Sequence, residues 1–435
     1  MKKVLLIGNG AREHAMGDAL SKSAEVFVLG GERNPGLMKL AAEYAVADAC
    51  DRDAILEFAE RVRPDFAVVG PEAPIAAGVA DVLMEHGVRS ASPLAIAGQL
   101  ESSKSFTRDL LGKYGIAGNP RFKVFLNEEG LEEFFAELGG DFVVKADGLK
   151  SGKGVKVSGD HLGSRKEGLA YARECIGEGG RVVVEEKLIG QEFSLMSFCD
   201  GMTTVDMPAV QDHKRAFDGD KGSNTGGMGS YSCADHILPF LKKSDVEAAA
   251  EITRKVAGAL FEETGKYFKG VMYGGFMAVA DGVRLIEYNA RFGDPEAMNV
   301  LPIIKTDFVE VCQAIIAGEL AGMKIEFENK ATVCKYVVPK GYPDKPVKGE
   351  KIIIGDVPAG VRTYFALVDS REDGLYLSGS RAVAFVGIGD TVEEAEKLAQ
   401  SAVEKVQGPV FYRKDIGTKA LIDERIKMMK EIRGK

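Results

Sequence analysis

Short apolar runs alternate with helical segments near the start of the chain. The runs at residues 4–7, 25–30 and 66–69 are predicted as strands, and residues 12–21 and 51–62 as helices. Such alternation is typical of βαβ units that assemble a parallel sheet. We therefore predict an α/β first domain that ends near Ser92 and Pro93. Open parallel sheets bind ligands at the carboxyl ends of their strands, so polar residues there are candidates for a site.

Glycine-containing turns follow two of these strands, at Gly8-Asn9-Gly10 and at Gly70-Pro71-Glu72. Gly-x-Gly suggests a dinucleotide fingerprint, but Glu13 stands where the third glycine is needed, which disfavours a nicotinamide or flavin site. Two glycines at a helix N-terminus still suit one phosphate group, and Arg12 and Glu13 could contact a sugar phosphate. The alternative is a tight strand-to-helix turn with solvated charges.

A glycine loop lies between two predicted strands in the middle of the chain. The strand at residues 142–145 ends in Lys145, and the loop that follows contains Gly152, Lys153 and Gly154. Loop amides can fold over phosphates, and a strand lysine can reach a phosphate, as in kinases. A Walker A loop is excluded because no helix follows; a flexible hairpin remains the alternative. The strand at residues 181–189 ends in acids, where exposed backbone could bind a base edge.

Residues 211–231 form a long polar segment that mixes lysine, arginine and aspartate and closes with glycines. A loop of that length without secondary structure is usually functional or disordered. Glycine amides and basic groups would suit an anionic small molecule, and Met228 and Tyr231 look like anchors that oppose disorder. His213 is expected to be a polar loop residue rather than a base. Ser244-x-x-Glu247 predicts a capping box that opens the next helix.

The segment at residues 285–296 carries the strongest chemical signal. Glu287 and Asn289 are two apart on a predicted strand end, so they share a face. A carboxylate and an amide oxygen suit Mg²⁺, which takes one or two ligands from protein and the rest from phosphates and water. Arg291 adds a planar fork that matches a carboxylate or phosphate. The alternative is a solvated strand end with a helix-capping Asp294.

Strands separated by Gly/Pro turns dominate the chain after Ala321. We predict them at residues 332–338, 351–354, 364–368 and 382–386, before a helix that Thr391 caps and that runs to residue 406. This tail has few convergent polar groups, and it is expected to be a β-rich domain that covers the site.

Bulk properties exclude several classes of protein. A length of 435 residues suggests three domains, and a net charge of −9 without a basic run disfavours a nucleic-acid partner. The 6 cysteines lie far apart with no Cys-x-x-Cys pair, which favours reduced thiols in a cytosol over a zinc site. No apolar run has membrane-spanning length. We expect a soluble, cytoplasmic protein without a membrane partner.

Taken together, these motifs resemble the ATP-grasp family, and within it the ligases that activate glycine. The most specific parts are residues 211–231 and 287–296; the turns at residues 8–14 and 70–74 agree. The resemblance implies an N-terminal parallel-sheet, Rossmann-like domain over residues 1–102 and an ATP-grasp domain over 103–325. It also implies a small mobile lid at residues 118–188 and a β-rich C-terminal domain over 326–435.

The resemblance also implies an activity. ATP would convert glycine into glycyl phosphate, and the amine of 5-phosphoribosylamine would displace phosphate to give glycinamide ribonucleotide and ADP, a step of de novo purine biosynthesis. Phosphoryl transfer needs in-line placement and charge neutralisation more than covalent help. The cofactors would be ATP and Mg²⁺ or Mn²⁺, the partners would be the two small substrates, and a monomer or dimer is expected.

Residue roles follow from the same resemblance. Glu287 and Asn289 would hold the metal, Glu186 and Leu188 would contact adenine through their backbone, and catalytic roles fall to Arg291, Lys145 and Asp212. The residues expected at ATP are Lys104, Lys145, Gly152, Lys153, Gly154, Glu186, Leu188 and Glu192. Those expected at the substrates are Asn9, Gly10, Glu72, Asp212, Lys214, Gly227, Arg291 and Asp294. The strand at residues 271–277 lacks the second metal acid that many ATP-grasp enzymes carry.

Two other functions stay open on the sequence. A carboxylase-type ATP-grasp ligase would use bicarbonate in place of glycine, although the segment at residues 211–231 argues against it. A non-catalytic nucleotide-binding module would bind ATP and would tolerate replacement of Glu287.

Overall fold

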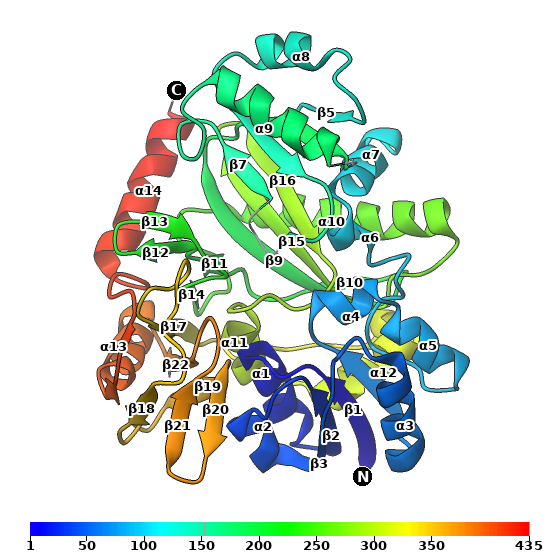
Figure 1. The fold of residues 1–435 in the computed structure, drawn as a ribbon, viewed down its shortest axis with the longest axis vertical. Helices are drawn as coiled ribbons and strands as arrows, with labels where there is room; N and C mark the ends of the chain where they lie inside the picture. Colours follow the sequence, from blue (N-terminus) through cyan, green and yellow to red (C-terminus); the bar gives the residue numbers. More distant parts are fainter. Residues whose placement is uncertain (151–153, 179, 435) are drawn as a thin grey trace.

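The computed structural model describes residues 1–150, 154–178 and 180–434. The N-terminal domain (blue in Figure 1) lies at one end, beside the strands of the C-terminal domain (orange), and the central sheet extends away from both. The C-terminal helix (red) runs along the central sheet. The chain is thus a mixed α/β protein, as predicted. Within the described ranges, no helix is both long enough and apolar enough to cross a membrane.

The N-terminal domain is built on a parallel sheet of order β3-β2-β1-β4. Its strands are β1 (Lys2–Ile7), β2 (Ala24–Gly30), β3 (Ala41–Val46) and β4 (Phe66–Val69). Its helices are α1 (Ala11–Leu20), α2 (Pro35–Leu40), α3 (Arg52–Val62), α4 (Glu72–Ala76) and α5 (Val79–Glu85). The three predicted strands and both predicted helices are confirmed. β3 escaped prediction because this edge strand is only partly buried and has no continuous apolar run.

The segment predicted as the lid folds as a separate small sheet of order β5-β8-β6-β7, with antiparallel pairing throughout. Its elements are β5 (Phe122–Phe125), α8 (Leu131–Leu138), β6 (Phe142–Ala146), β7 (Val155–Val157), α9 (Arg165–Gly177) and β8 (Val182–Glu186). It buries its own apolar cluster, in which the rings of Phe135 and Phe142 meet edge to face at 4.9 Å. The strand predicted at residues 181–189 is β8, and it ends at Glu186 rather than at residue 189.

The central sheet has the order β10-β9-β15-β16 and is antiparallel. Its strands are β9 (Gln191–Cys199), β10 (Thr204–Asp206), β15 (Gly270–Val279) and β16 (Gly282–Asn289). The accompanying helices are α6 (Gln99–Ser102), α7 (Lys104–Lys113), α10 (Lys243–Thr264), α11 (Ala297–Val300), η1 (Leu301–Ile303), α12 (Phe308–Ala317) and η2 (Leu320–Gly322).

The predicted capping box of α10 is wrong. The N-cap is Lys242, two residues earlier, and the Asp245 carboxylate accepts its backbone N–H at 2.7 Å. Asp245 prevails over Ser244 because its buried carboxylate also binds Arg433 at 2.7 Å, a partner that the local sequence does not reveal.

The polar segment at residues 211–231 is not a structureless loop. It contains β11 (Gln211–Asp212), β12 (Arg215–Phe217), β13 (Lys221–Asn224) and β14 (Gly229–Ser232). β14 is fully buried because it pairs with both β11 and β17. Met228 and Tyr231 are buried, which confirms them as anchors. His213 lies in the short connection between β11 and β12, as expected of a loop residue, but its side chain is buried. Polar composition concealed these strands, since tertiary pairing rather than an apolar run stabilises them.

The C-terminal domain is β-rich, as predicted. One antiparallel sheet has the order β11-β14-β17-β22-β19, with β24 also on β17, and the other has the order β20-β21-β18-β23. The new strands are β17 (Ala331–Pro339), β18 (Lys351–Ile354), β19 (Val361–Phe365), β20 (Val368–Arg371), β21 (Gly374–Leu377), β22 (Val383–Gly389), β23 (Val406–Gln407) and β24 (Val410–Phe411). The helices are α13 (Val392–Val403), capped by Thr391 as expected, and α14 (Lys419–Arg433). The single strand expected at residues 364–368 is split between β19 and β20.

A buried histidine joins the N- and C-terminal domains. His14 on α1 lies parallel to the ring of Phe365 at 5.9 Å, and its Nδ1 accepts the backbone N–H of Phe365 at 2.9 Å. Burial, followed by the charge of Lys39, lowers the pKa of His14 to about 4. The imidazole is therefore neutral in the folded protein at neutral pH.

We expect this histidine to couple stability to pH. The unfolded chain binds a proton at His14 below its ordinary pKa of 6.5, whereas the folded chain does so only near pH 4. Its contribution is therefore complete above pH 6.5 and is lost as the pH falls toward 4. Between pH 7 and pH 5 the wild type should lose about 2 kcal/mol more unfolding free energy than His14→Gln, measured by urea titration. Parallel pH dependences of the two proteins would contradict this assignment.

Candidate active site

A cavity of about 140 Å³ lies between the lid, α6, α7 and the end of β16. It brings together residues that are far apart in the chain. Seven of the predicted site residues line it: Glu72, Lys104, Lys145, Gly154, Glu287, Asn289 and Arg291.

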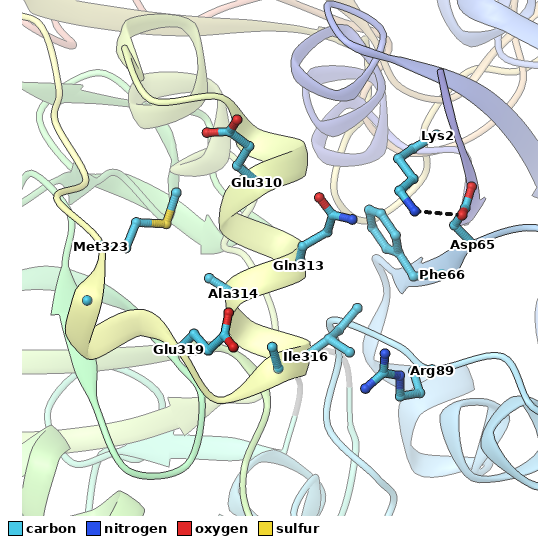
Figure 2. Close-up of a pocket in the computed structure, with 12 residues that line it drawn as sticks. Lys2, Asp65, Phe66, Arg89, Glu310, Gln313, Ala314, Ile316, Glu319 and Met323 are labelled. Carbon is cyan, nitrogen blue, oxygen red and sulfur yellow. Dashed lines mark hydrogen bonds and ion pairs between the residues drawn. The ribbon is translucent and has the colours of Figure 1, made fainter.

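A larger cavity of about 850 Å³ lies elsewhere, at the amino ends of β1 and β4 (Figure 2). There Lys2 pairs with Asp65 at 2.9 Å, across from Glu310 and Gln313 of α12. None of the predicted site residues lines this cavity. We therefore place the candidate active site in the smaller cavity, which the predicted site residues line.

Glu287 and Asn289 project from the same face of β16. They alternate with Tyr288, which is buried in the core and whose hydroxyl lies 3.0 Å from Thr253 Oγ1. Burial alone would raise the pKa of Glu287, but surrounding cations outweigh it and lower the pKa. These cations are Lys214, Lys145, Lys104 and Arg291. Glu287 is thus an ionised carboxylate in a strongly positive setting.

The two oxygen ligands fit Mg²⁺ as it is bound in nucleotide sites. Within the part of the chain that the structure describes, no cluster of three or more His, Cys, Asp or Glu side chains could hold a metal alone. A carboxylate and an amide oxygen would supply two ligands, and phosphates and water the others. This donor set suits a metal that arrives with a nucleotide rather than one enclosed by protein.

Arg291 lies beside this pair and is held from several sides. Its Nη2 donates to Asn289 Oδ1 at 3.2 Å and lies 2.7 Å from Glu101 Oε1. Its Nε is buried without a hydrogen-bond partner among the described residues, and Glu72 Oε2 is 3.5 Å away. A buried donor that is not fully satisfied marks a place where an anionic group can bind.

Lys145 is held at the back of the cavity by a buried ion pair. Its Nζ lies 2.8 Å from Glu185 Oε2 and donates to the carbonyl of Ile286 at 2.9 Å. Arg108 binds the same carboxylate at 2.5 Å. Burial opposes ionisation of Glu185, yet the two cations lower its pKa. Lys145 is thus buried, and its partners Glu185 and Arg108 are not revealed by the local sequence.

The other residues predicted at ATP are less closely grouped. Lys104 Nζ donates to the carbonyl of Gly148 at 2.8 Å, which ties α7 to the glycine loop. Gly152 and Lys153 lie outside the described residues. The cavity lining does not include Glu186, Leu188 or Glu192. Glu186 accepts the N–H of Arg121 at 2.8 Å, and Glu192 pairs with Lys214 at 3.1 Å.

A second group of predicted residues converges beside the cavity. Gly227 has φ +107°, and a Cβ on it would lie 2.8 Å from Asp212 Oδ1. A Cβ on Gly10 would lie 3.9 Å from Asp294 Oδ2. Burial, followed by the charge of Glu296, raises the pKa of Asp212 well above its ordinary value. The structure thus places Asp212 by Gly227 and Asp294 by Gly10.

The start of α1 differs from the expected phosphate site. The backbone N–H of Gly10 donates to Glu13 Oε2 at 2.7 Å, so that amide is not free. Arg12 Nε binds Glu13 Oε1 at 2.6 Å and Arg12 Nη1 donates to the carbonyl of Phe292 at 3.1 Å. The residue that replaces the third glycine therefore covers the helix terminus. Asn9 accepts the N–H of Gly31 at 3.0 Å.

The C-terminal domain contributes polar groups that the sequence analysis did not anticipate. Tyr336 donates to Asp294 Oδ1 at 2.6 Å, and Arg381 Nη2 lies 3.2 Å from Asp294 Oδ2. The expectation of few convergent polar groups in this domain is wrong. No local pattern marks either residue, since one lies on a buried strand and the other in a turn.

The chain resembles known proteins over nearly its whole length. The chain matches three domain families described as phosphoribosylglycinamide synthetase: the N domain over residues 2–101, the ATP-grasp (A) domain over 102–297 and the C domain over 332–419. It is 51% identical to the phosphoribosylamine–glycine ligase of Methanocaldococcus jannaschii, over 99% of this chain and 100% of the relative. It is 46% identical to the ligase of the same name from Pyrococcus furiosus, over 100% of this chain and 98% of the relative.

Solved structures agree with these relatives. The crystal structure of phosphoribosylamine–glycine ligase from Thermotoga maritima superposes with a TM-score of 0.80 at 30% identity, covering 95% of this chain and 100% of that one. The biotin carboxylase domain of Hydrogenobacter thermophilus 2-oxoglutarate carboxylase, solved with MgADP, has a TM-score of 0.70 at 17% identity. It covers 99% of this chain and 94% of that one, and at this identity the likeness concerns the fold alone.

Proposed function

Because this chain belongs to the phosphoribosylglycinamide synthetase family, we propose that the cavity beneath its lid is where ATP activates glycine. The chain is an ATP-dependent carbon–nitrogen ligase that joins glycine to 5-phosphoribosylamine, the second step of de novo purine biosynthesis. The observation that carries the cavity assignment is the meeting of Glu287, Asn289 and Arg291 with three lysines.

Glu287 and Asn289 are the proposed metal ligands. Their placement on one face of β16 and the lowered pKa of Glu287 support this role. A bound Mg²⁺ would neutralise charge on the phosphates of ATP. Lys104 and Lys145 would bind phosphate oxygens, and Gly148 and Gly154, which line the same cavity, would offer backbone amides to them.

The carboxylate of glycine is a poor electrophile, so it must first be activated by ATP. The carboxylate oxygen of glycine attacks the terminal phosphorus of ATP, the bond to ADP breaks, and glycyl phosphate forms. Arg291 would orient the carboxylate. Its buried Nε, which has no hydrogen-bond partner among the described residues and lies 3.5 Å from Glu72 Oε2, supports this role. Phosphoryl transfer of this kind depends on alignment and charge neutralisation more than on covalent help from protein.

The second half-reaction forms the amide bond. The amine of 5-phosphoribosylamine attacks the carbonyl carbon of glycyl phosphate, the bond to phosphate breaks, and the amine loses a proton. Asp212 is the proposed acceptor of that proton, because its raised pKa brings it closer to the working pH of a general base. Lys214, Gly227, Asp294, Asn9, Gly10 and Glu72 would complete the binding site for this substrate.

We assign the domain boundaries to residues 102 and 325, with the lid at residues 118–188. The separate apolar cluster of the lid supports its movement as one body. Closure over ATP would exclude water and protect the acyl phosphate from hydrolysis. A cytoplasmic location is proposed because all six cysteines carry free thiols, five of them buried.

An assay of ADP formation tests these assignments. ADP should form at an appreciable rate only when glycine and freshly prepared 5-phosphoribosylamine are both present, because the acyl phosphate is consumed only by the amine. Bicarbonate in place of glycine should not support turnover. Bicarbonate-dependent ADP formation would instead favour the carboxylase-type alternative, and ATP binding without turnover under all conditions would favour a binding module.

A further inference from the structure

Arg381 connects the C-terminal domain to the proposed binding site for 5-phosphoribosylamine, called the acceptor site below. It lies in the turn between β21 and β22, and its Nη1 donates to the carbonyls of Gly226, Gly227 and Asp294 at 2.5, 3.2 and 3.0 Å. Its Nη2 lies 3.2 Å from the carboxylate oxygen Oδ2 of Asp294. One guanidinium thus binds two segments that are remote in the chain.

The same domain holds Arg381 itself in place. Its guanidinium carbon lies 4.4 Å above the ring centre of Tyr336, a fully buried residue. The Tyr336 hydroxyl donates to Asp294 Oδ1 at 2.6 Å. Both carboxylate oxygens of Asp294 are therefore bound by the C-terminal domain, one by each residue.

Hydrogen bonds hold the backbone of the Gly226–Gly227 turn from several sides. The N–H of Gly226 donates to the hydroxyl of Tyr342 at 3.0 Å, and the N–H of Gly227 donates to Thr225 Oγ1 at 3.0 Å. Arg381 satisfies the carbonyls of the same turn. A Cβ on Gly227 would lie 2.8 Å from Asp212 Oδ1, so the turn that Arg381 binds lies directly beside Asp212.

We propose that Arg381 is a positioning residue for 5-phosphoribosylamine, acting through Asp294 and the Gly226–Gly227 turn. This inference rests on the proposed assignment of Asp294, Gly227 and Asp212 to that substrate. A planar fork suits the role, because one lysine ammonium cannot align three carbonyls and a carboxylate at once. None of the groups that Arg381 contacts lines the cavity assigned to ATP and glycine.

Steady-state kinetics with each substrate varied in turn tests the proposal. Arg381→Gln should raise the KM for 5-phosphoribosylamine about tenfold or more, since it removes several charge-assisted hydrogen bonds. The KM values for ATP and glycine should change by less than about twofold. Arg381→Lys should restore only part of the loss. Tyr336→Phe, which deletes one hydroxyl and keeps the ring, should shift the same constant in the same direction without impairing folding.

Arg371 provides a matched control in the same domain. It binds Asp369 at 2.8 Å and stacks on Tyr376 at 4.1 Å, but it is exposed and remote from the acceptor site. Arg371→Gln should leave all three KM values and the melting temperature unchanged.

The kinetics of Arg381 and Asp294 variants distinguish the role of Arg381 from the assignment of Asp294 to the 5-phosphoribosylamine site. Equal rises in all three KM values, an unchanged KM for 5-phosphoribosylamine, or full activity of Arg381→Lys would overturn the role of Arg381. If Asp294→Asn also leaves the KM for 5-phosphoribosylamine unchanged, the assignment of the acceptor site has failed. If Asp294→Asn raises that KM and Arg381→Gln does not, only the inference about Arg381 has failed.

Discussion

Replacing Glu287 with glutamine should reduce ADP formation by about a thousandfold, which corresponds to roughly 4 kcal/mol of lost transition-state stabilisation. The change keeps the shape of the side chain and removes the charge that four cations surround. It should therefore weaken metal binding and leave the lysines and Arg291 to repel one another. Initial rates at a series of Mg²⁺ concentrations measure the effect, and high Mg²⁺ should recover part of the loss. Glu287→Ala should abolish metal-dependent turnover.

Glu43 offers a control for the charge change alone. It lies on β3 and pairs with Arg61 at 2.6 Å, in another domain and away from the cavity. Glu43→Gln should retain wild-type rates, and the circular dichroism of both variants should match the wild type. Near-wild-type turnover by Glu287→Gln would show that the metal is held elsewhere.

Replacing Arg291 with lysine should lower kcat/KM for glycine about a hundredfold, although the positive charge is kept. The guanidinium of this cavity-lining residue contacts Asn289 and Glu101 through Nη2, and its buried Nε lies 3.5 Å from Glu72 Oε2. A lysine ammonium cannot bind Asn289, Glu101 and a substrate carboxylate at the same time. Rates measured with glycine varied at saturating ATP should reveal the change.

Arg284 is the matched control for this substitution. It lies on β16, the strand that leads to Arg291, binds both carboxylate oxygens of Asp281 at 3.0 and 2.8 Å, and does not line the cavity. Arg284→Lys should leave the kinetics unchanged. If Arg291→Lys affects only the KM for ATP, Arg291 contacts the nucleotide and does not orient glycine.

Local patterns were sufficient where one short segment buries its own apolar side chains. β1, β2 and β4 were predictable because each is a continuous apolar run in a parallel sheet that is covered on both faces. The apolar spacing of Val246, Ile252, Val256 and Leu260 predicts one face of α10, and the last three are buried while Val246 is half-buried. Glu287 and Asn289 could be paired from spacing alone, because side chains two apart on a strand share a face.

Tertiary structure was needed where a partner comes from a distant part of the chain. The strands at residues 211–231 are stabilised by pairing with β17, so their polar composition concealed them. The cap of α10 depends on Arg433, and the environment of Lys145 depends on Glu185 and Arg108. None of these partners can be identified from the residues that are neighbours in the sequence.

The sequence by itself determined the α/β character of the N-terminal end, the β-rich character of the C-terminal end, and the polar segments from which seven predicted residues meet at one cavity. These features depend on apolar periodicity and on side-chain type, which are local properties. Only the tertiary structure decided that Glu13 covers the start of α1 and that Arg381 and Tyr336 hold Asp294. The reason is physical: a hydrogen bond or ion pair between remote segments depends on the path of the whole backbone, which no local pattern records.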